Sequence, residues 1–224
     1  MAKCSWIQMV RVAVFAAAAL GAAGSSLPAG ATSVTVGVVG ESRDCTFGCV
    51  EILQQVYDGA NFGSAPVEIT SVGFFSASDV ANSGSFDLYL STSNNPLGSL
   101  SPVFADNSGA DRQFFGSLTL SGLPADMSLV NFLGSFDYDP TVGDLLVEFE
   151  STVFGRGSFW ASSDQGIGRV HSRNEALSGF VTQNFGLTTQ FELADPIPEP
   201  STSVLMGLGL VALGARRRIG LPTG

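Results

Sequence analysis

Basic side chains are scarce in this 224-residue sequence, and lysine is almost absent. Charged residues make up 13% of the chain, about half of the fraction usual in soluble domains. Residues 32–198 contain five arginines and no lysine against 19 carboxylates, a net charge of −14. Such a body repels phosphate backbones, whose binding depends on counterion release by Lys and Arg. The composition therefore argues against nucleic acid as a partner.

Histidine is limited to one residue, which restricts the catalytic chemistry available. His171 is the only conventional histidine base, and no Gly-x-Ser-x-Gly sequence precedes a helical pattern. A Ser-His-Asp triad built from distant strands stays open, because such sites are defined by geometry rather than spacing. The favoured hypothesis is an ordinary surface histidine in a protein that is not an enzyme and holds no cofactor.

The N-terminal residues have the three-part layout of a secretory signal. Lys3 and Arg11 precede the apolar run 12–23, and the small-residue triplet 29–31 follows a polar stretch. This order is typical of export signals. We therefore expect cleavage after Ala31 and the Sec export machinery as a partner, with a buried N-terminal helix as the alternative.

The C-terminal residues combine a proline-rich junction, a short apolar run and a basic cluster. In order, they are Pro198, Glu199, Pro200 and Ser201, the run 204–215, and Arg216, Arg217 and Arg218. Twelve helical residues span roughly 18 Å, which is short for a bilayer core of about 30 Å. The arginines act as a membrane stop on the cytoplasmic side. An ordinary tail anchor explains the run and the arginines, but not Pro-Glu-Pro.

Residues 196–218 resemble the PEP-CTERM sorting signal of Gram-negative bacteria. The resemblance implies that Pro198, Glu199, Pro200 and Ser201 are the motif recognised by an exosortase, an integral-membrane processing enzyme. It also implies a membrane-anchored precursor, transient contact with the inner membrane, and delivery to the cell surface or extracellular matrix. Proteins with such a tail tend to come from bacteria that make extracellular polysaccharide and biofilm.

Cys45 and Cys49 are the cysteines that remain once residues 1–31 are removed. Their spacing permits a tight loop, and an oxidising periplasm favours a disulfide. Because that loop is short, its stabilisation is expected at or below the low end of about 2–4 kcal/mol. A redox pair and half of a zinc site are the alternatives.

Short alternating segments predict an all-β body over residues 32–195. Strands are expected at 33–39, 67–75, 85–91, 114–121, 144–150, 157–161 and 187–193, with 51–57 favoured as a strand over a helical turn. Turn clusters separate them at 81–84, 94–98, 106–109 and 139–143. Many short strands with such turns indicate an antiparallel β-sandwich, jelly-roll-like. A signal helix and a short C-terminal membrane helix would flank this body.

Two of the expected strands show which side chains share a face. Phe86, Leu88 and Leu90 lie together, opposite Asp87 and Tyr89. In the same way Leu145, Val147 and Phe149 lie opposite Leu146, Glu148 and Glu150. We expect each strand to have one face in the core and one in water.

Clustered carboxylates in turns are the candidates for a metal site. Oxygen ligands of this kind suit calcium, and the candidates are Asp106, Asp111, Asp137, Asp139 and Asp144. Neither the segment 106–111 nor the segment 137–144 has the spaced Asp-x-Asp-x-Asp-Gly loop with its distal Glu that is typical of calcium-binding loops. Solvated turn residues are the favoured interpretation, and one bound calcium ion is the alternative.

Aromatic side chains and paired carboxylates raise the possibility of a carbohydrate site. Trp160, Tyr57, Tyr89 and Tyr138 are candidate stacking platforms, although alternation leaves at most one of Phe159 and Trp160 exposed, and core packing is favoured. Glycosidases need two carboxyl groups at a fixed separation across a cleft. The sequence supplies same-face acidic pairs but no such separation.

The sequence thus predicts an exported, non-catalytic surface or extracellular-matrix protein, structural or adhesive in a polysaccharide matrix or biofilm. Its expected parts are a signal peptide (1–31), a body (32–195), a sorting signal (196–218) and a tail (219–224). Extracellular polysaccharide is a candidate partner. The alternative is a carbohydrate-binding module or a weak glycan-acting enzyme.

Overall fold

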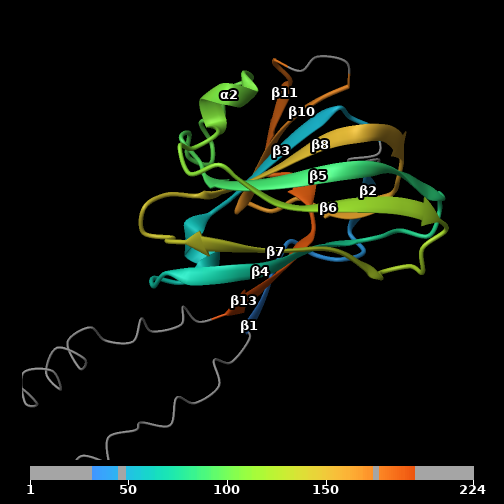
Figure 1. The fold of residues 1–224 in the computed structure, drawn as a ribbon, viewed down its shortest axis with the longest axis horizontal. Helices are drawn as coiled ribbons and strands as arrows, with labels where there is room; N and C mark the ends of the chain where they lie inside the picture. The colour runs from blue at the N-terminus through green and yellow to red at the C-terminus, as the bar shows by residue number, and fades with distance from the viewer. Residues whose placement is uncertain (1–31, 45–48, 174–176, 195–224) are drawn as a thin grey trace, which may run out of the picture.

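Two antiparallel sheets face each other in the computed structural model, which describes residues 32–44, 49–173 and 177–194 (Figure 1). The upper sheet in Figure 1 contains, in spatial order, β11 (Phe180–Gln183), β10 (Ile167–Ser172), β3 (Ile52–Tyr57), β8 (Leu145–Arg156), β5 (Asn82–Thr92) and β6 (Gln113–Gly122). The lower sheet contains β1 (Thr32–Val36), β13 (Thr189–Ala194), β4 (Val67–Phe75) and β7 (Leu129–Tyr138). The predicted antiparallel all-β body is confirmed, and the jelly-roll detail stays a prediction.

Three further elements complete the described body. A small sheet has the order β12 (Gly186–Leu187), β9 (Phe159–Ser162) and β2 (Ser42–Asp44), and the Ser76–Phe159 bridge links it to the end of β4. Two single-turn helices, η1 (Gly59–Phe62) and α2 (Phe104–Asn107), lie in connections. No helix in these described ranges is both long and apolar enough to cross a membrane. The expected signal helix and C-terminal membrane helix lie outside the described residues.

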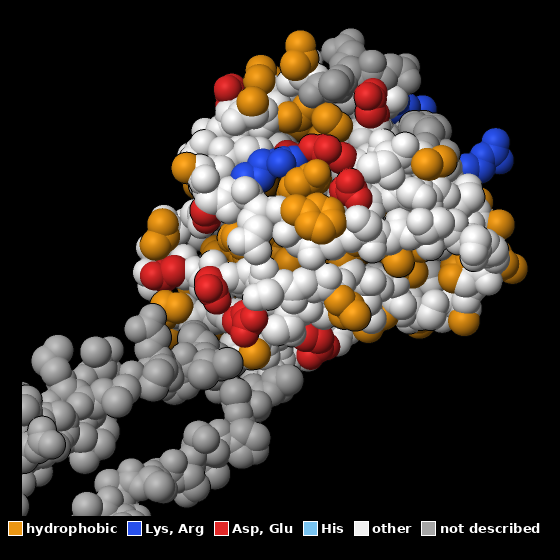
Figure 2. Space-filling model, in the orientation of Figure 1, with side chains coloured by type: hydrophobic (Ala, Val, Ile, Leu, Met, Phe, Trp, Pro, Cys, Tyr) orange, Lys and Arg blue, Asp and Glu red, His pale blue; other side chains and the backbone are white. Residues whose placement is uncertain are grey.

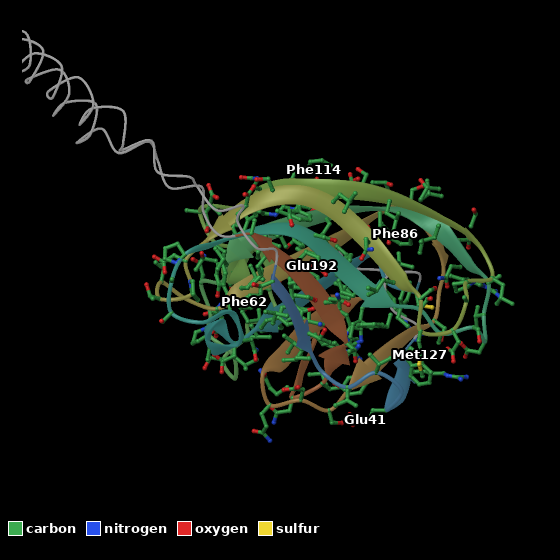
Figure 3. The ribbon with its side chains drawn as sticks, turned by 90° about the horizontal axis from the view of Figure 1, so that it is seen from below. Glu41, Phe62, Phe86, Phe114, Met127 and Glu192 are labelled. Carbon is green, nitrogen blue, oxygen red and sulfur yellow. The ribbon has the colours of Figure 1, made fainter. Side chains whose placement is uncertain are left out.

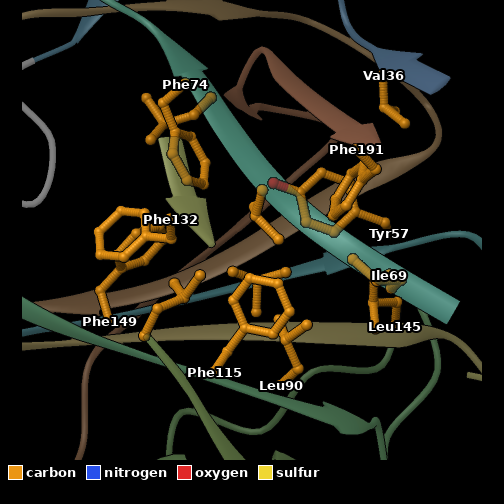
Figure 4. Close-up of a cluster of buried hydrophobic side chains, with 14 of the residues drawn as sticks. Val36, Tyr57, Ile69, Phe74, Leu90, Phe115, Phe132, Leu145, Phe149 and Phe191 are labelled. Carbon is orange, nitrogen blue, oxygen red and sulfur yellow. The ribbon is translucent and has the colours of Figure 1, made fainter. Parts of the chain in front are cut away.

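Aromatic side chains fill the space between the two sheets (Figure 4). Phe149 of β8 contacts Phe74 and Phe132 of the facing sheet, with ring centroids 4.9 and 5.7 Å apart in edge-to-face geometry. Tyr57 of β3 and Phe191 of β13 make a similar pair at 4.9 Å. Edge-to-face pairs add to the stabilisation that area burial alone provides. The core thus joins the sheets through rings contributed by both.

Two glycines allow β6 and β7, edge strands of the two sheets, to approach closely. A Cβ atom on Gly134 would lie 2.2 Å from the carbonyl oxygen of Phe115, and one on Gly116 would lie 2.7 Å from that of Leu133. No side chain fits at such distances from backbone. The absence of a Cβ at both positions therefore brings the sheets together along this side.

The outer face of the six-stranded sheet is covered by residues 93–112, the connection between β5 and β6, and is not open to water throughout. A second apolar cluster forms there between Leu100 and Phe104 of this cover and Val56, Leu146 and Val170 of the sheet. The prediction that β8 has one wet face is wrong at Leu146 and Glu148, which are both buried. The alternation of side chains was predicted correctly, but the cover was not.

Most of the expected strands exist. The segments 33–39, 51–57, 67–75, 85–91, 114–121, 144–150, 157–161 and 187–193 correspond to β1, β3, β4, β5, β6, β8, β9 and β12–β13. The core faces of β5 and β8 are those predicted, with Phe86, Leu88, Leu90 and Phe149 all buried. The sequence patterns missed β2, β7, β10 and β11.

The predicted turn at 81–84 is wrong, because β5 already begins at Asn82. Gly84 has a φ of 114°, and the pairing with β8 shifts register across it, between Ser83 and Ser85, and again just after it, between Ser85 and Phe86. A glycine tolerates this positive φ without strain. The cluster therefore forms a bulge inside a strand instead of ending it.

Replacing Phe149 with alanine tests the core. We expect Phe149→Ala to lower the free energy of unfolding by about 3–5 kcal/mol, because it removes a fully buried ring and leaves a cavity. Phe114→Ala, the same change at a side chain that is 51% exposed, is the control and should cost less than about 1 kcal/mol. Urea titration followed by tryptophan fluorescence measures both, and equal losses would contradict this account of the core.

Candidate functional site

Among the described residues, no three of the five candidate calcium ligands come together as a metal site, and four of the five accept hydrogen bonds from nearby groups. Asp144 accepts from the backbone N–H groups of Gly59 (3.0 Å) and Leu97 (2.7 Å). Asp111 accepts from the backbone N–H (3.0 Å) and hydroxyl (2.7 Å) of Thr92. These carboxylates therefore fasten connections onto the body.

The other three carboxylates are Asp106, Asp137 and Asp139. Asp106 accepts from the hydroxyl of Ser101 at 2.8 Å, and Asp139 accepts from the backbone N–H (2.9 Å) and hydroxyl (2.7 Å) of Thr141. Asp137 lies on β7 opposite Glu68 of β4. Within residues 32–44, 49–173 and 177–194, no three His, Cys, Asp or Glu side chains stand close enough to hold a metal ion. One calcium ion stays an untested alternative.

The sorting and cysteine predictions fall largely outside the described residues. Pro198, Glu199, Pro200 and Ser201, Arg216, Arg217 and Arg218, and also Cys45 lie outside them. Cys49 is disulfide-bonded. The pairing of Cys45 with Cys49 therefore stays a prediction.

The tryptophan proposed as an alternative sugar platform belongs to the interior. Phe159 and Trp160 are both buried, and the Trp160 indole N–H donates to Asp126 at 3.2 Å. The Arg43 guanidinium lies 4.8 Å from the centre of the Trp160 ring. Tyr57 and Tyr138 are also buried, so Tyr89 is the candidate aromatic that remains partly accessible.

One ion-pair cluster on the outer face of the six-stranded sheet has the polar and aromatic groups of a binding surface. We call it the Arg112 cluster; it consists of Tyr89, Arg112, Phe114, Glu148 and Glu150. Arg112 donates from Nε to Glu148 at 2.8 Å and from a terminal nitrogen to Glu150 at 2.5 Å. Its guanidinium lies 3.7 Å from the centre of the Tyr89 ring. The cation is therefore held by two carboxylates and one aromatic face.

Glu148 is the buried member of the Arg112 cluster, with a side chain only 8% exposed. Its second oxygen accepts from Gln54 Nε2 and, at 3.2 Å, from the Ser108 hydroxyl of the cover. Gln54 also donates to the carbonyl of Phe104 at 3.0 Å and accepts from Asn107 at 2.9 Å. The buried charge thus has four donor contacts, which joins the sheet to the cover.

The exposed side of the Arg112 cluster is aromatic and acidic. Phe114 meets Tyr89 edge-to-face at 5.7 Å, and it lies at the outer rim of the ribbon in Figure 3. Burial, together with the nearby Glu148 charge, raises the pKa of the Glu150 carboxyl, although Arg112 opposes the shift. Figure 2 shows basic, acidic and hydrophobic side chains side by side on this face of the body. Such a surface offers a ring face and carboxylate acceptors.

Sequence reasoning placed Tyr89 and the Glu148–Glu150 pair but missed Arg112, Phe114 and Gln54. The scarcity of arginine could have indicated Arg112, because in a body with five arginines and 19 carboxylates each arginine is expected to pair with one or more carboxylates. No local pattern predicted that residues 93–112 fold over the sheet. This tertiary arrangement is what brings Arg112 to β8.

The C-terminal residues carry the signal of an exported bacterial protein that is sorted to the cell surface. Residues 196–218 match the family profile described as the PEP-CTERM protein-sorting motif. The chain therefore carries a PEP-CTERM sorting signal, as its sequence predicted, and exosortase is the processing partner that this motif implies. The match covers the tail and says nothing of the body.

Comparisons of the body give no functional relative. No curated protein matches the sequence. Among solved structures, the clostridial cysteine protease Cwp84 after propeptide cleavage is 10% identical, covering 74% of this chain and 40% of that chain at a TM-score of 0.40. Infectious bursal disease virus, Gt strain, is 9% identical, covering 85% and 48% at a TM-score of 0.29. This chain spans less than half of either, and at these TM-scores neither likeness bears on function.

Removing the cation of the Arg112 cluster tests its structural role. We expect Arg112→Ala to destabilise the protein by about 3 kcal/mol, because a buried carboxylate loses its partner. The exposed Arg156→Ala on β8 is the matched control and should stay within about 0.5 kcal/mol. Adding Glu148→Gln to Arg112→Ala should recover part of the loss, since the uncompensated charge is gone. Chemical denaturation measures the cycle, and a neutral Arg112→Ala would contradict this role.

Proposed function

We propose that the protein is an exported, non-catalytic component of the cell surface or extracellular matrix, with a structural or adhesive role in polysaccharide matrix or biofilm. The observation that carries this proposal is the sorting motif at residues 196–218. In the proposed route the chain crosses the inner membrane of a Gram-negative cell, is held briefly as a membrane-anchored precursor, and is released by exosortase.

The hydrogen bonds and ion pairs of the carboxylates in the body support a binding or structural role. The carboxylates Asp111, Asp139 and Asp144 fix loops through hydrogen bonds. Glu148 and Glu150 share one arginine, so both are drawn to the same cation and not placed on opposite sides of a cleft as a glycosidase requires. These structural roles of the carboxylates favour a body that holds no cofactor and catalyses no reaction.

A carbohydrate-binding module is the second candidate, and the Arg112 cluster favours it. Phe114 presents an exposed ring beside Tyr89, and Glu150 and Asp87 lie nearby as acceptors for sugar hydroxyls. Aromatic faces pack well against the apolar faces of pyranose rings. A neutral sugar suits this acidic surface better than an anionic one.

The mass of the exported protein tests the sorting route. In the native host we expect a mature species that starts near Thr32 and ends between Pro198 and Pro200. Glu199→Ala should block processing and leave a membrane-bound chain ending at Gly224, whereas Glu51→Ala, an exposed carboxylate of the body, should process normally. Intact-mass spectrometry of membrane and secreted fractions distinguishes these results. A wild-type chain still ending at Gly224 would overturn the route.

A glycan array tests the second candidate. Selective binding of a neutral glycan, weakened about tenfold or more by Phe114→Ala and unchanged by Leu133→Ala, would favour a carbohydrate-binding module; the stacking of one nucleobase on an aromatic side chain is worth a comparable amount. Leu133 is the control because it is an exposed apolar side chain on a different strand. A blank array favours the structural or adhesive role.

A further inference from the structure

A basic pocket lies on the inner side of the six-stranded sheet, away from the Arg112 cluster. It has a volume of about 50 Å³ and is lined by Asp44, Cys49, Val50, Leu53, Arg169, His171 and Arg173. A cavity of roughly 10–15 Å³ already holds one water, so this one admits a group of several atoms. Two of the five arginines of an acidic body and its only histidine meet here.

The register of β10 shows why Arg169 and His171 point into this pocket. His171 pairs with Leu53 and Arg169 with Gln55 of β3, and residues paired across antiparallel strands share a face. Leu53 is part of the core between the sheets. Arg169 and His171 therefore occupy positions where the alternation of β10 would place apolar core residues, about 7 Å apart along the strand.

Both inward-facing side chains have a buried nitrogen without a hydrogen-bond partner among the described residues. These atoms are Arg169 Nε and His171 Nδ1. Arg169 does pair with Asp44 of β2 through a terminal nitrogen, which leaves Nε–H unused. A buried polar atom without a partner costs about 1–3 kcal/mol. The pocket therefore holds one unused donor, Arg169 Nε–H, and a second nitrogen, His171 Nδ1, that donates once it is protonated.

The charge inside the pocket suits one negative charge. Arg169 and Arg173 are cationic and Asp44 is anionic, so one positive charge remains when His171 is neutral. Burial and the charges of Arg169 and Arg173 lower the pKa of His171, and the Asp44 carboxylate opposes this shift. Arg173 is exposed and forms no ion pair with another described residue. The remaining carboxylates of the body are screened beyond about 8–10 Å.

An exposed aromatic ring stands beside the pocket. Phe180 of β11 pairs with His171, their ring centroids are 6.2 Å apart, and 78% of Phe180 is accessible. The charged pocket and the exposed Phe180 ring therefore lie next to each other on the surface.

We propose that this pocket binds the carboxylate of an acidic sugar, a uronic acid, whose ring lies against Phe180. Arg169 Nε–H and, when the imidazolium forms, His171 Nδ1–H match the two oxygens of one planar carboxylate, and the single surplus charge matches a monoanion better than a phosphate dianion. Phe180 supplies the contact for the C–H face of the ring. This site is distinct from the Arg112 cluster, and binding there does not depend on the sorting route.

The pocket also gives binding a pH dependence with a defined sign. A carboxylate favours the imidazolium form of His171, whose pKa without ligand lies below the ordinary value of 6.5. Protonation and binding therefore strengthen each other. The charged groups that face His171 are Arg169, Arg173 and Asp44. Affinity for a carboxylate should rise as the pH falls from about 7.5 to about 5.5.

Calorimetric titration of the protein purified from its host tests the proposal with four probes: sodium glucuronate, sodium acetate, inorganic phosphate and glucose. We expect glucuronate to bind, acetate to bind more weakly, and glucose to give no heat. Arg173→Ala should weaken glucuronate about tenfold or more. Phe180→Ala should weaken glucuronate severalfold and leave acetate unchanged. The control Arg156→Ala, an exposed arginine elsewhere, should change either affinity less than twofold.

Several results would overturn the proposal. Phosphate binding as tightly as glucuronate, or equal effects of Phe180→Ala on acetate and glucuronate, would show a general oxyanion site without sugar recognition. Loss of affinity in Phe114→Ala instead of Phe180→Ala would place the sugar at the Arg112 cluster. An absence of heat with glucuronate at pH 5.5 would show that the pocket binds no uronate. Titration with polygalacturonate then distinguishes a chain of uronates, which should bind more tightly per molecule, from the free sugar.

Discussion

Two adjacent glutamines on β3, Gln55 and Gln54, have buried side-chain amides that need hydrogen-bond partners within the protein. The partners that they find hold much of the architecture together. Gln55 faces the core, where it exchanges hydrogen bonds with the backbone of Leu187 at 2.9 and 2.8 Å and contacts Tyr57. Gln54 faces the opposite way, to Phe104, Asn107 and Glu148. Because an unpaired buried amide is costly, the first glutamine fixes the small sheet against the large one. The second fixes the 93–112 cover, and with it the position of Arg112.

The contrast between the two faces of the six-stranded sheet has a functional meaning. On the outer face each oxygen of Glu148 accepts from a donor, so the buried part of the Arg112 cluster is fully hydrogen-bonded. On the inner face, at the end formed by β10 and β11, Arg169 and His171 each retain an unused nitrogen. Satisfied polar networks make a fold rigid and specific, whereas unsatisfied groups in a pocket are available to a ligand. The same sheet thus carries a fully hydrogen-bonded carboxylate on one side and a pocket with two unpartnered nitrogens on the other.

The sequence predicted those parts of the fold whose side chains obey strict alternation. β5 and β8 follow it, and their core faces were assigned correctly. β10 does not, because Arg169 and His171 occupy core-facing positions, and β7 is interrupted by Gly134, which is needed for the approach of Phe115. Both exceptions carry a constraint from elsewhere in the molecule, and local patterns contain no information about it. The tail was recognisable because it is read as a linear signal, while Arg112 and Phe180 acquire their surroundings only through tertiary contacts.

The glycine contact between β6 and β7 has a consequence for a protein that carries an export and sorting signal. These strands are the edges of their sheets, and an uncovered edge is a template on which further chains can polymerise. With Gly116 and Gly134 admitting the opposing backbone, each edge shields the other. A bulkier residue at either position would separate them and expose hydrogen-bonding groups to neighbouring copies, so the cost of such a change would appear as fibres or precipitate as well as lower stability.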